Sequence, residues 1–161
     1  MIKLVKVKSE FYELCKNNEI DKELLHNEQG RPCVLLIKLR YQERSYDFVV
    51  PLRSNISPTV PKNQYFALPP SSHTNHGRKH GVHYYKLFPV TRTYIDKFVT
   101  TDNAYYTTVL NILNRHESDI IKACQEYLME CEKGNKHYIT PDIDGIIDVL
   151  DFLKYKNGTA I

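Results

Sequence analysis

Two stretches of this 161-residue chain decide its fold: Cys33-Val-Leu-Leu-Ile-Lys-Leu-Arg-Tyr41 and Ser45-Tyr-Asp-Phe-Val-Val-Pro51. Both are rich in β-branched and aromatic residues, which favour strands. A short turn over residues 42–44 separates them, so the two stretches predict an antiparallel hairpin with one buried face. Because proline cannot donate to a strand ladder, Pro51 is expected to end the second strand and to leave residues 52–55 irregular.

Further elements are expected on both sides of this hairpin. They are a strand over residues 2–7, a helix over 10–17 capped by Ser9, strands over 64–68 and 82–90 with the latter extended to 94, a helix over 102–115 capped by Asp102, a helix over 117–133 ended by Gly134, and a helix from Thr140 onward. A long loop, 69–81, is expected between two of the strands, and loops of this length are usually functional or disordered. The pattern predicts the α+β class, with a strongly twisted antiparallel sheet or partial barrel and packed helices.

Length and composition indicate one globular domain over residues 1–161. Hydrophobic residues make up 42% and charged residues 25%, as in ordinary folded domains. The chain has no long apolar run and no apolar signal segment, so it is expected to lie in the cytoplasm without membrane contact. The four cysteines form no Cys-x-x-Cys pair and are interpreted as reduced core residues.

The net charge of +3 is unevenly distributed. Residues 1–100 hold 16 Lys and Arg against 9 Asp and Glu, whereas residues 101–161 hold 6 against 10. No acidic residue occurs between Phe48 and Ile95. The same stretch contains Arg53, Lys62, Arg78, Lys79, Lys86 and Arg92. A polyanion-binding surface needs such an acid-free stretch, although a solvated basic loop would have the same composition.

Four histidines in this stretch suggest chemistry on a phosphate. His73, His76, His80 and His83 are spaced like one face of a helix, which would suit a metal, but Gly77 and Gly81 argue against that helix. No metal site and no cofactor are therefore expected. Imidazole can transfer protons near neutral pH, and guanidinium can hold two phosphate oxygens. RNA supplies its own nucleophile, the 2′-hydroxyl, so these side chains favour metal-independent cleavage of RNA.

A resemblance to a known family is carried by Tyr46-Asp-Phe-Val-Val-Pro-Leu-Arg-Ser54 and His80-Gly-Val-His-Tyr-Tyr-Lys-Leu-Phe-Pro-Val90. The first segment resembles the strand and Pro-Leu-Thr/Arg-Ser segment of type III toxin–antitoxin toxins of the ToxN and AbiQ kind. The second is similar to their later Leu-Gly-(apolar)-Asn-(apolar) strand, which ends in Ile-Pro-Ile or similar. The order and length of the remaining elements are also similar, and the histidine-rich loop and Arg53 look most like the CptN branch.

The resemblance implies a barrel-like sheet related to the MazF and Kid toxins and an endoribonuclease that acts on cellular or phage mRNA. It also implies inhibition by a small structured RNA antitoxin, a pseudoknot that the toxin cuts from a repetitive precursor and that bridges toxin subunits into a closed assembly. Ser54 matches the active-site serine of the family, whereas Arg53 falls where ToxN has threonine and Ile56 where it has lysine. A family tyrosine falls at Phe11, beside Tyr12, and a family lysine near Arg31.

Two sets of site residues follow from these patterns. The residues expected to be catalytic are Arg53, Ser54, His73, His76 and His80. The residues expected to bind RNA are Lys8, Tyr12, Arg31, Lys62, Tyr65, Arg78, Lys79, Tyr84, Lys86 and Arg92. A non-catalytic RNA-binding module, in which tyrosines stack on bases, remains an alternative, as does a zinc-containing hydrolase built on the histidines.

Overall fold

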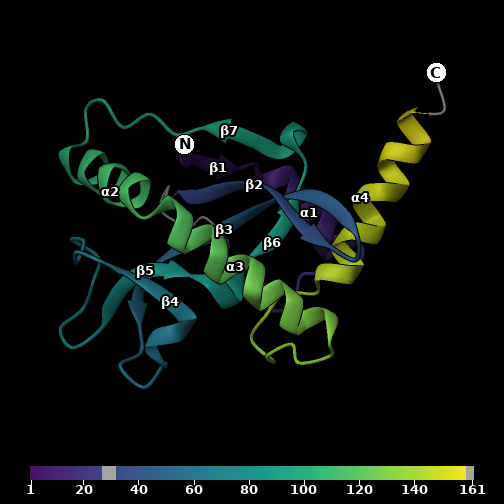
Figure 1. Ribbon diagram of the computed structural model, residues 1–161. Helices are drawn as coiled ribbons and strands as arrows, with labels where there is room; N and C mark the ends of the chain where they lie inside the picture. Colours follow the sequence, from purple (N-terminus) through teal and green to yellow (C-terminus); the bar gives the residue numbers. More distant parts are fainter. Residues whose placement is uncertain (27–31, 159–161) are drawn as a thin grey trace.

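The computed structural model describes residues 1–26 and 32–158 of the chain (Figure 1). Its strands are β1 (Lys3–Val7), β2 (Cys33–Tyr41), β3 (Arg44–Ile56), β4 (Tyr65–Leu68), β5 (Lys79–His83), β6 (Phe88–Val90) and β7 (Ile95–Lys97). Its α-helices are α1 (Ser9–Asn17), α2 (Ala104–Arg115), α3 (Glu117–Glu132) and α4 (Ile143–Gly158). Short 3₁₀ turns lie at Lys62–Gln64, Tyr84–Lys86 and Arg92–Tyr94. The predicted α+β class is confirmed.

The strands form one antiparallel sheet in the order β4-β5-β3-β2-β1-β7, with β6 paired to β3 beside β5. β4 and β7 are the two edges, and no pairing among the described residues joins them. The sheet is therefore open and does not close into a barrel.

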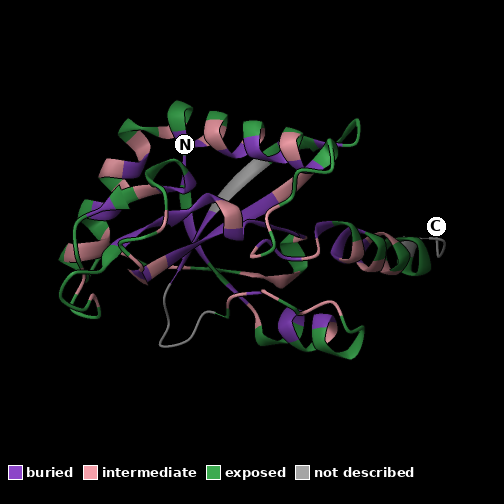
Figure 2. Cartoon of the chain, turned by 90° about the horizontal axis from the view of Figure 1, so that it is seen from below, coloured by how far each residue is buried: buried purple, intermediate pink, exposed green. Residues whose placement is uncertain are grey.

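Helices cover both faces of this sheet, and strand alternation sends core residues to each face (Figure 1). Val34, Phe48 and Val50 face the core under α2 and α3. Cys33 and Val49 face a second core with α1 and the first half of α4. The second half of α4 projects from the body and is mostly exposed (Figure 2).

The hairpin of β2 and β3 is confirmed, but the expectation that Pro51 ends the second strand is wrong, because β3 continues to Ile56. On one side of β3, residues Asp47–Val49 pair with β6 and Leu52 begins the pairing with β5. On the other side, Pro51 lies opposite Cys33, the first residue of β2. Pro51 thus lies where the partner of β3 changes from β6 to β5, a break in the ladder at which proline is tolerated inside a strand.

Three smaller expectations also need correction. The predicted strand over 82–94 is divided by two 3₁₀ turns, and β5 begins at Lys79, inside the predicted loop. Asn103, not Asp102, caps α2, because its side chain accepts a hydrogen bond from the Tyr106 backbone at 3.0 Å. Lys8 occupies the N-cap position of α1 in place of Ser9. The four cysteines, all in the described part of the chain, are buried and form no disulfide with one another. No helix in the described ranges has the length and apolar character needed to span a bilayer.

Candidate functional site

A pocket of 260 Å³ opens at the C-terminal end of β3. Its lining residues are Leu25, His26, Pro51, Leu52, Arg53, Ser54 and Asn55. Between Arg53 and Ile56 the register with β5 shifts, so that three steps along β3 correspond to two along β5. Such a bulge re-aims side chains, and Arg53 and Ser54, at its start, both line the pocket. The predicted pair Arg53 and Ser54 is therefore brought together.

The guanidinium of Arg53 is held by a histidine from the neighbouring strand. Arg53 Nη1 lies 3.1 Å from Nδ1 of His83, which is fully buried at the end of β5. Since guanidinium has only donors, Nδ1 must accept this hydrogen bond, and the single ring proton then sits on Nε2. Burial, with the charges of Arg53, Lys86 and His137 nearby, lowers the pKa of His83 to about 3. The imidazole is therefore neutral at physiological pH.

Strand alternation separates His83 from His80. Arg53 pairs with Gly81 and Tyr65 pairs with His83, so Arg53, His83 and Tyr65 share one face of the sheet. Gly81 lies on that face too, and a Cβ there would stand 2.4 Å from the Phe66 carbonyl oxygen. His80 faces the opposite side, with its Nδ1 3.0 Å from the Pro69 carbonyl oxygen and in contact with the Tyr105 hydroxyl. The structure does not bring His80 together with Arg53.

Lys86 and Glu23 form a partly buried ion pair near this site. The Lys86 ammonium donates to the Glu23 carboxylate at 2.8 Å and to the Glu23 backbone oxygen at 3.1 Å. The side chain of Lys86 is 6% exposed and that of Glu23 34%. The hydrogen bond from Lys86 lowers the pKa of Glu23, and Arg53 contributes to the same shift. Lys86, predicted to bind RNA, is thus neutralised and covered.

We expect Glu23→Gln to lower stability and to weaken its dependence on acid. Because the folded protein depresses the pKa of Glu23 below 4.5, the ion pair contributes stability above that pH and loses it as the pH falls through the folded value. Glu23→Gln leaves the Lys86 ammonium buried beside a neutral amide. Urea unfolding between pH 7 and pH 3 measures both effects. Equal stability of variant and wild type at pH 7 would show that the pair contributes nothing.

The imidazole of His26 packs on a tyrosine predicted to bind RNA. The rings of His26 and Tyr12 stack with centroids 4.3 Å apart and planes 18° apart. Tyr12 is 7% exposed and belongs to the core under α1, whereas His26 is exposed. Tyr12 therefore supports one wall of the pocket.

The loop that carries His73 and His76 is fastened to the pocket by Asn55. The Asn55 side chain donates to the His73 backbone oxygen at 2.9 Å and accepts from the Asn75 backbone at 2.7 Å. His73 and His76 are exposed on this loop. The structure thus places both on a loop tied to a pocket residue, and neither lines the pocket.

The remaining predicted RNA-binding residues fall into four groups. Lys62, Arg78, Lys79 and Arg92 are exposed, and Arg92 pairs with Asp47 at 3.4 Å. Lys8 is partly exposed and pairs with Asp96 at 3.7 Å, next to Glu10. Tyr65 and Tyr84 are 8% and 7% exposed, so they present little ring surface on which a base could stack. Arg31 lies outside the described residues.

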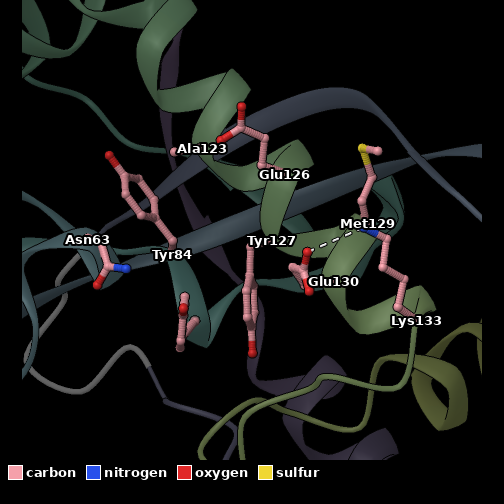
Figure 3. A pocket seen from close by; sticks show the side chains of 9 residues that line it. Asn63, Tyr84, Ala123, Glu126, Tyr127, Met129, Glu130 and Lys133 are labelled. Atoms are coloured by element: carbon pink, nitrogen blue, oxygen red, sulfur yellow. Dashed lines mark hydrogen bonds and ion pairs between the residues drawn. The ribbon is translucent and has the colours of Figure 1, made fainter.

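A larger pocket of 470 Å³ lies between α3 and the turn at Tyr84–Lys86 (Figure 3). Glu126 and Glu130 face it, and Lys133 pairs with Glu130 at 3.5 Å. Two carboxylates against one lysine repel phosphate, so the chemistry favours the smaller pocket for an anionic ligand. Within the described ranges, no three His, Cys, Asp or Glu side chains gather closely enough to hold a metal ion.

Sequence reasoning missed three residues of this site: Glu23, His26 and His83. The signal for His83 was present, since the period of two in a strand puts His83 and Gly81 on one face and His80 on the other. Nothing in the sequence pairs Glu23 with Lys86 or His26 with β3, because both residues lie in an irregular segment that only the tertiary fold positions.

No protein-family model and no curated protein matches this chain. Two solved structures are similar to it along almost the whole length. One, from work on bacterial type III toxin–antitoxin systems and selective toxin inhibition by a non-coding RNA pseudoknot, has a TM-score of 0.70 and 15% identity and covers 95% of this chain and 98% of its own. The other, from work on a processed non-coding RNA that regulates a bacterial antiviral system, has a TM-score of 0.65 and 13% identity, with coverage of 91% and 95%. The likeness is one of fold.

Proposed function

We propose that this chain is a metal-independent endoribonuclease, the toxin of a type III toxin–antitoxin system. The observation that carries the proposal is the placement of Arg53 and Ser54 in one pocket, at a bulge of β3, with the guanidinium held by a neutral histidine. Support comes from the fold, which is shared with a chain from a type III system that a non-coding RNA pseudoknot inhibits. We also propose that the chain belongs to the CptN branch, which its motifs resemble most, and that its open sheet is related to those of MazF and Kid.

The chemistry follows from the side chains in the pocket. The RNA 2′-oxygen bonds to phosphorus while the bond from phosphorus to the 5′-oxygen breaks. One proton leaves the 2′-hydroxyl and one reaches the 5′-oxygen, so the products are a 2′,3′-cyclic phosphate and a 5′-hydroxyl. Arg53 stabilises the charge that develops on the phosphorus oxygens. The Ser54 hydroxyl donates a hydrogen bond to the same group.

Exposed basic side chains in the acid-free stretch suit a polyanion. Lys62, Arg78 and Lys79 are exposed, and His73 and His76 lie on the loop that is tied to the pocket residue Asn55. In the proposal these groups bind the RNA backbone, and His80 supports the loop from the opposite face. The partners are a small structured RNA antitoxin, which bridges several copies of the single toxin domain into a closed assembly, and cellular or phage mRNA as substrate, in the cytoplasm.

Cleavage assays with defined RNA test the proposal. Purified chain should cut RNA in EDTA, and the fragments should end in a 2′,3′-cyclic phosphate and a 5′-hydroxyl. A single 2′-deoxyribose at the cut position should block cleavage and leave binding intact, because only the nucleophile is missing. Ser54→Ala should bind the same RNA and cut it more slowly. Tight RNA binding without cleavage would instead identify a non-catalytic RNA-binding module, and cleavage abolished by EDTA would contradict the metal-free mechanism.

A further inference from the structure

His26 shares the pocket of Arg53 and Ser54, and its imidazole is open to solvent. An exposed histidine on an irregular segment normally samples several rotamers. Here the ring stacks on Tyr12 at 4.3 Å, and Tyr12 is itself packed edge-on against the buried ring of Phe11 at 5.9 Å. One face of the imidazole is therefore covered, and its ring nitrogens lie in a plane set by the core.

The other six histidines are placed differently. His83 is buried, and His80 faces the opposite side of the sheet. His73 and His76 lie outside the pocket lining, His116 pairs with Asp119 at 3.7 Å, and the backbone of His137 donates to the Tyr127 hydroxyl at 3.1 Å. Of the seven histidines, all of which lie in the described part of the chain, His26 alone is both exposed and part of the pocket.

We propose that His26 is a catalytic proton-transfer residue of the pocket formed by Arg53 and Ser54, acting on the scissile group of RNA. The inference rests on the proposed ribonuclease function and names a group that does its acid–base work. Arg53 and Ser54 stabilise charge, but a guanidinium does not release its proton near neutral pH and a serine hydroxyl is a weak base. An imidazole in the same pocket supplies the missing proton transfer.

The step balances with water as the second proton-transfer partner. As the 2′-oxygen attacks phosphorus and the 5′-oxygen leaves, His26 either accepts the proton of the 2′-hydroxyl while water protonates the 5′-oxygen, or it protonates the 5′-oxygen while water accepts the proton of the 2′-hydroxyl. Solvent restores its protonation state between turnovers, which the exposure of His26 allows. Arg53, in the same pocket, remains charged throughout.

Three variants of the full chain test this assignment. His26→Ala should slow RNA cleavage by a factor on the order of 10²–10⁴, the usual loss for a positioned proton donor or acceptor. His26→Gln should be similarly slow, because an amide forms hydrogen bonds but exchanges no proton. His116→Ala is the matched control, an exposed histidine between α2 and α3 that does not line the pocket, and it should stay near the wild-type rate. Binding of RNA with one 2′-deoxyribose at the cut position should be equal for all.

Recovery of cleavage by added imidazole distinguishes proton transfer by His26 from a purely structural role. The space left in His26→Ala is open to solvent, so free imidazole should enter it and raise the cleavage rate of this variant in proportion to the imidazole concentration. The cleavage rate of His26→Gln should not change, because the glutamine side chain fills the space. A wild-type rate for His26→Ala, or recovery of the rate in His26→Gln, would overturn the assignment while the ribonuclease function stood. Absence of cleavage by the wild-type chain would overturn both.

Discussion

Arg53→Ala is expected to slow RNA cleavage by a factor on the order of 10²–10³, the loss seen when one preorganised donor to a developing oxyanion is removed. The loss should be large because β5 and the bulge of β3 set the position of the Arg53 guanidinium before the substrate binds. The change should lower the turnover number more than it raises the Michaelis constant, since Arg53 acts on charge that appears in the transition state. Single-turnover cleavage of a defined RNA measures it.

Two further variants make this prediction specific. Arg53→Lys keeps the positive charge but replaces the planar guanidinium, which can donate two parallel hydrogen bonds, with a compact ammonium. Its cleavage rate should therefore fall between those of the wild type and Arg53→Ala. Arg92→Ala removes an exposed arginine that pairs with Asp47, and it should cleave at close to the wild-type rate. If Arg92→Ala lost as much activity as Arg53→Ala, the loss would reflect overall positive charge and not the geometry at the end of β3.

The regular parts of the fold were predictable because their signals are local. The β2–β3 hairpin follows from two dense β-branched runs around a short turn, and α3 ends before Gly134, which has a φ of +86°. The wrong predictions concern features that depend on tertiary structure. Pro51 stays inside a strand because two different neighbours meet beside it, and no property of residues 45–56 alone reveals where β6 stops and β5 begins.

The site was predictable to the extent that it lies on one strand. Arg53 and Ser54 were identified from adjacent positions in a motif, and the structure places both in the same pocket. The histidines were chosen by spacing along a supposed loop, which gave no information on faces. Because β5 starts at Lys79, His83 lies on the same face of the sheet as Arg53, and His80 lies on the opposite face. Lys86 looked like a surface cation because its partner, Glu23, is distant in sequence.

The neutral contact between His83 and Arg53 leads to the last prediction, on how the guanidinium is positioned. A carboxylate in the place of His83 would orient Arg53 and also cancel its charge, whereas an imidazole acceptor adds no negative charge of its own. His83→Leu, which has no acceptor, should lower the turnover number by a factor on the order of 10², the loss that a misplacement of about 1 Å can cause. His83→Asn keeps an acceptor oxygen close to the position of Nδ1 and should retain most of the activity.

Two measurements separate this positioning role from a general loss of stability. In the double variant Arg53→Ala with His83→Leu, the second change should add little to the first, because both remove the same oriented group. The unfolded imidazole titrates near 6.5 and the folded one near 3, so the unfolded state binds more protons in between and the wild type loses stability as the pH falls through that range. Both His83 variants lack this titration and should show a flatter dependence in urea unfolding between pH 6.5 and pH 5, above the range in which Glu23 titrates. Equal rates for His83→Asn and His83→Leu would show that the acceptor at Nδ1 does not position Arg53, since the two variants differ in whether they provide it.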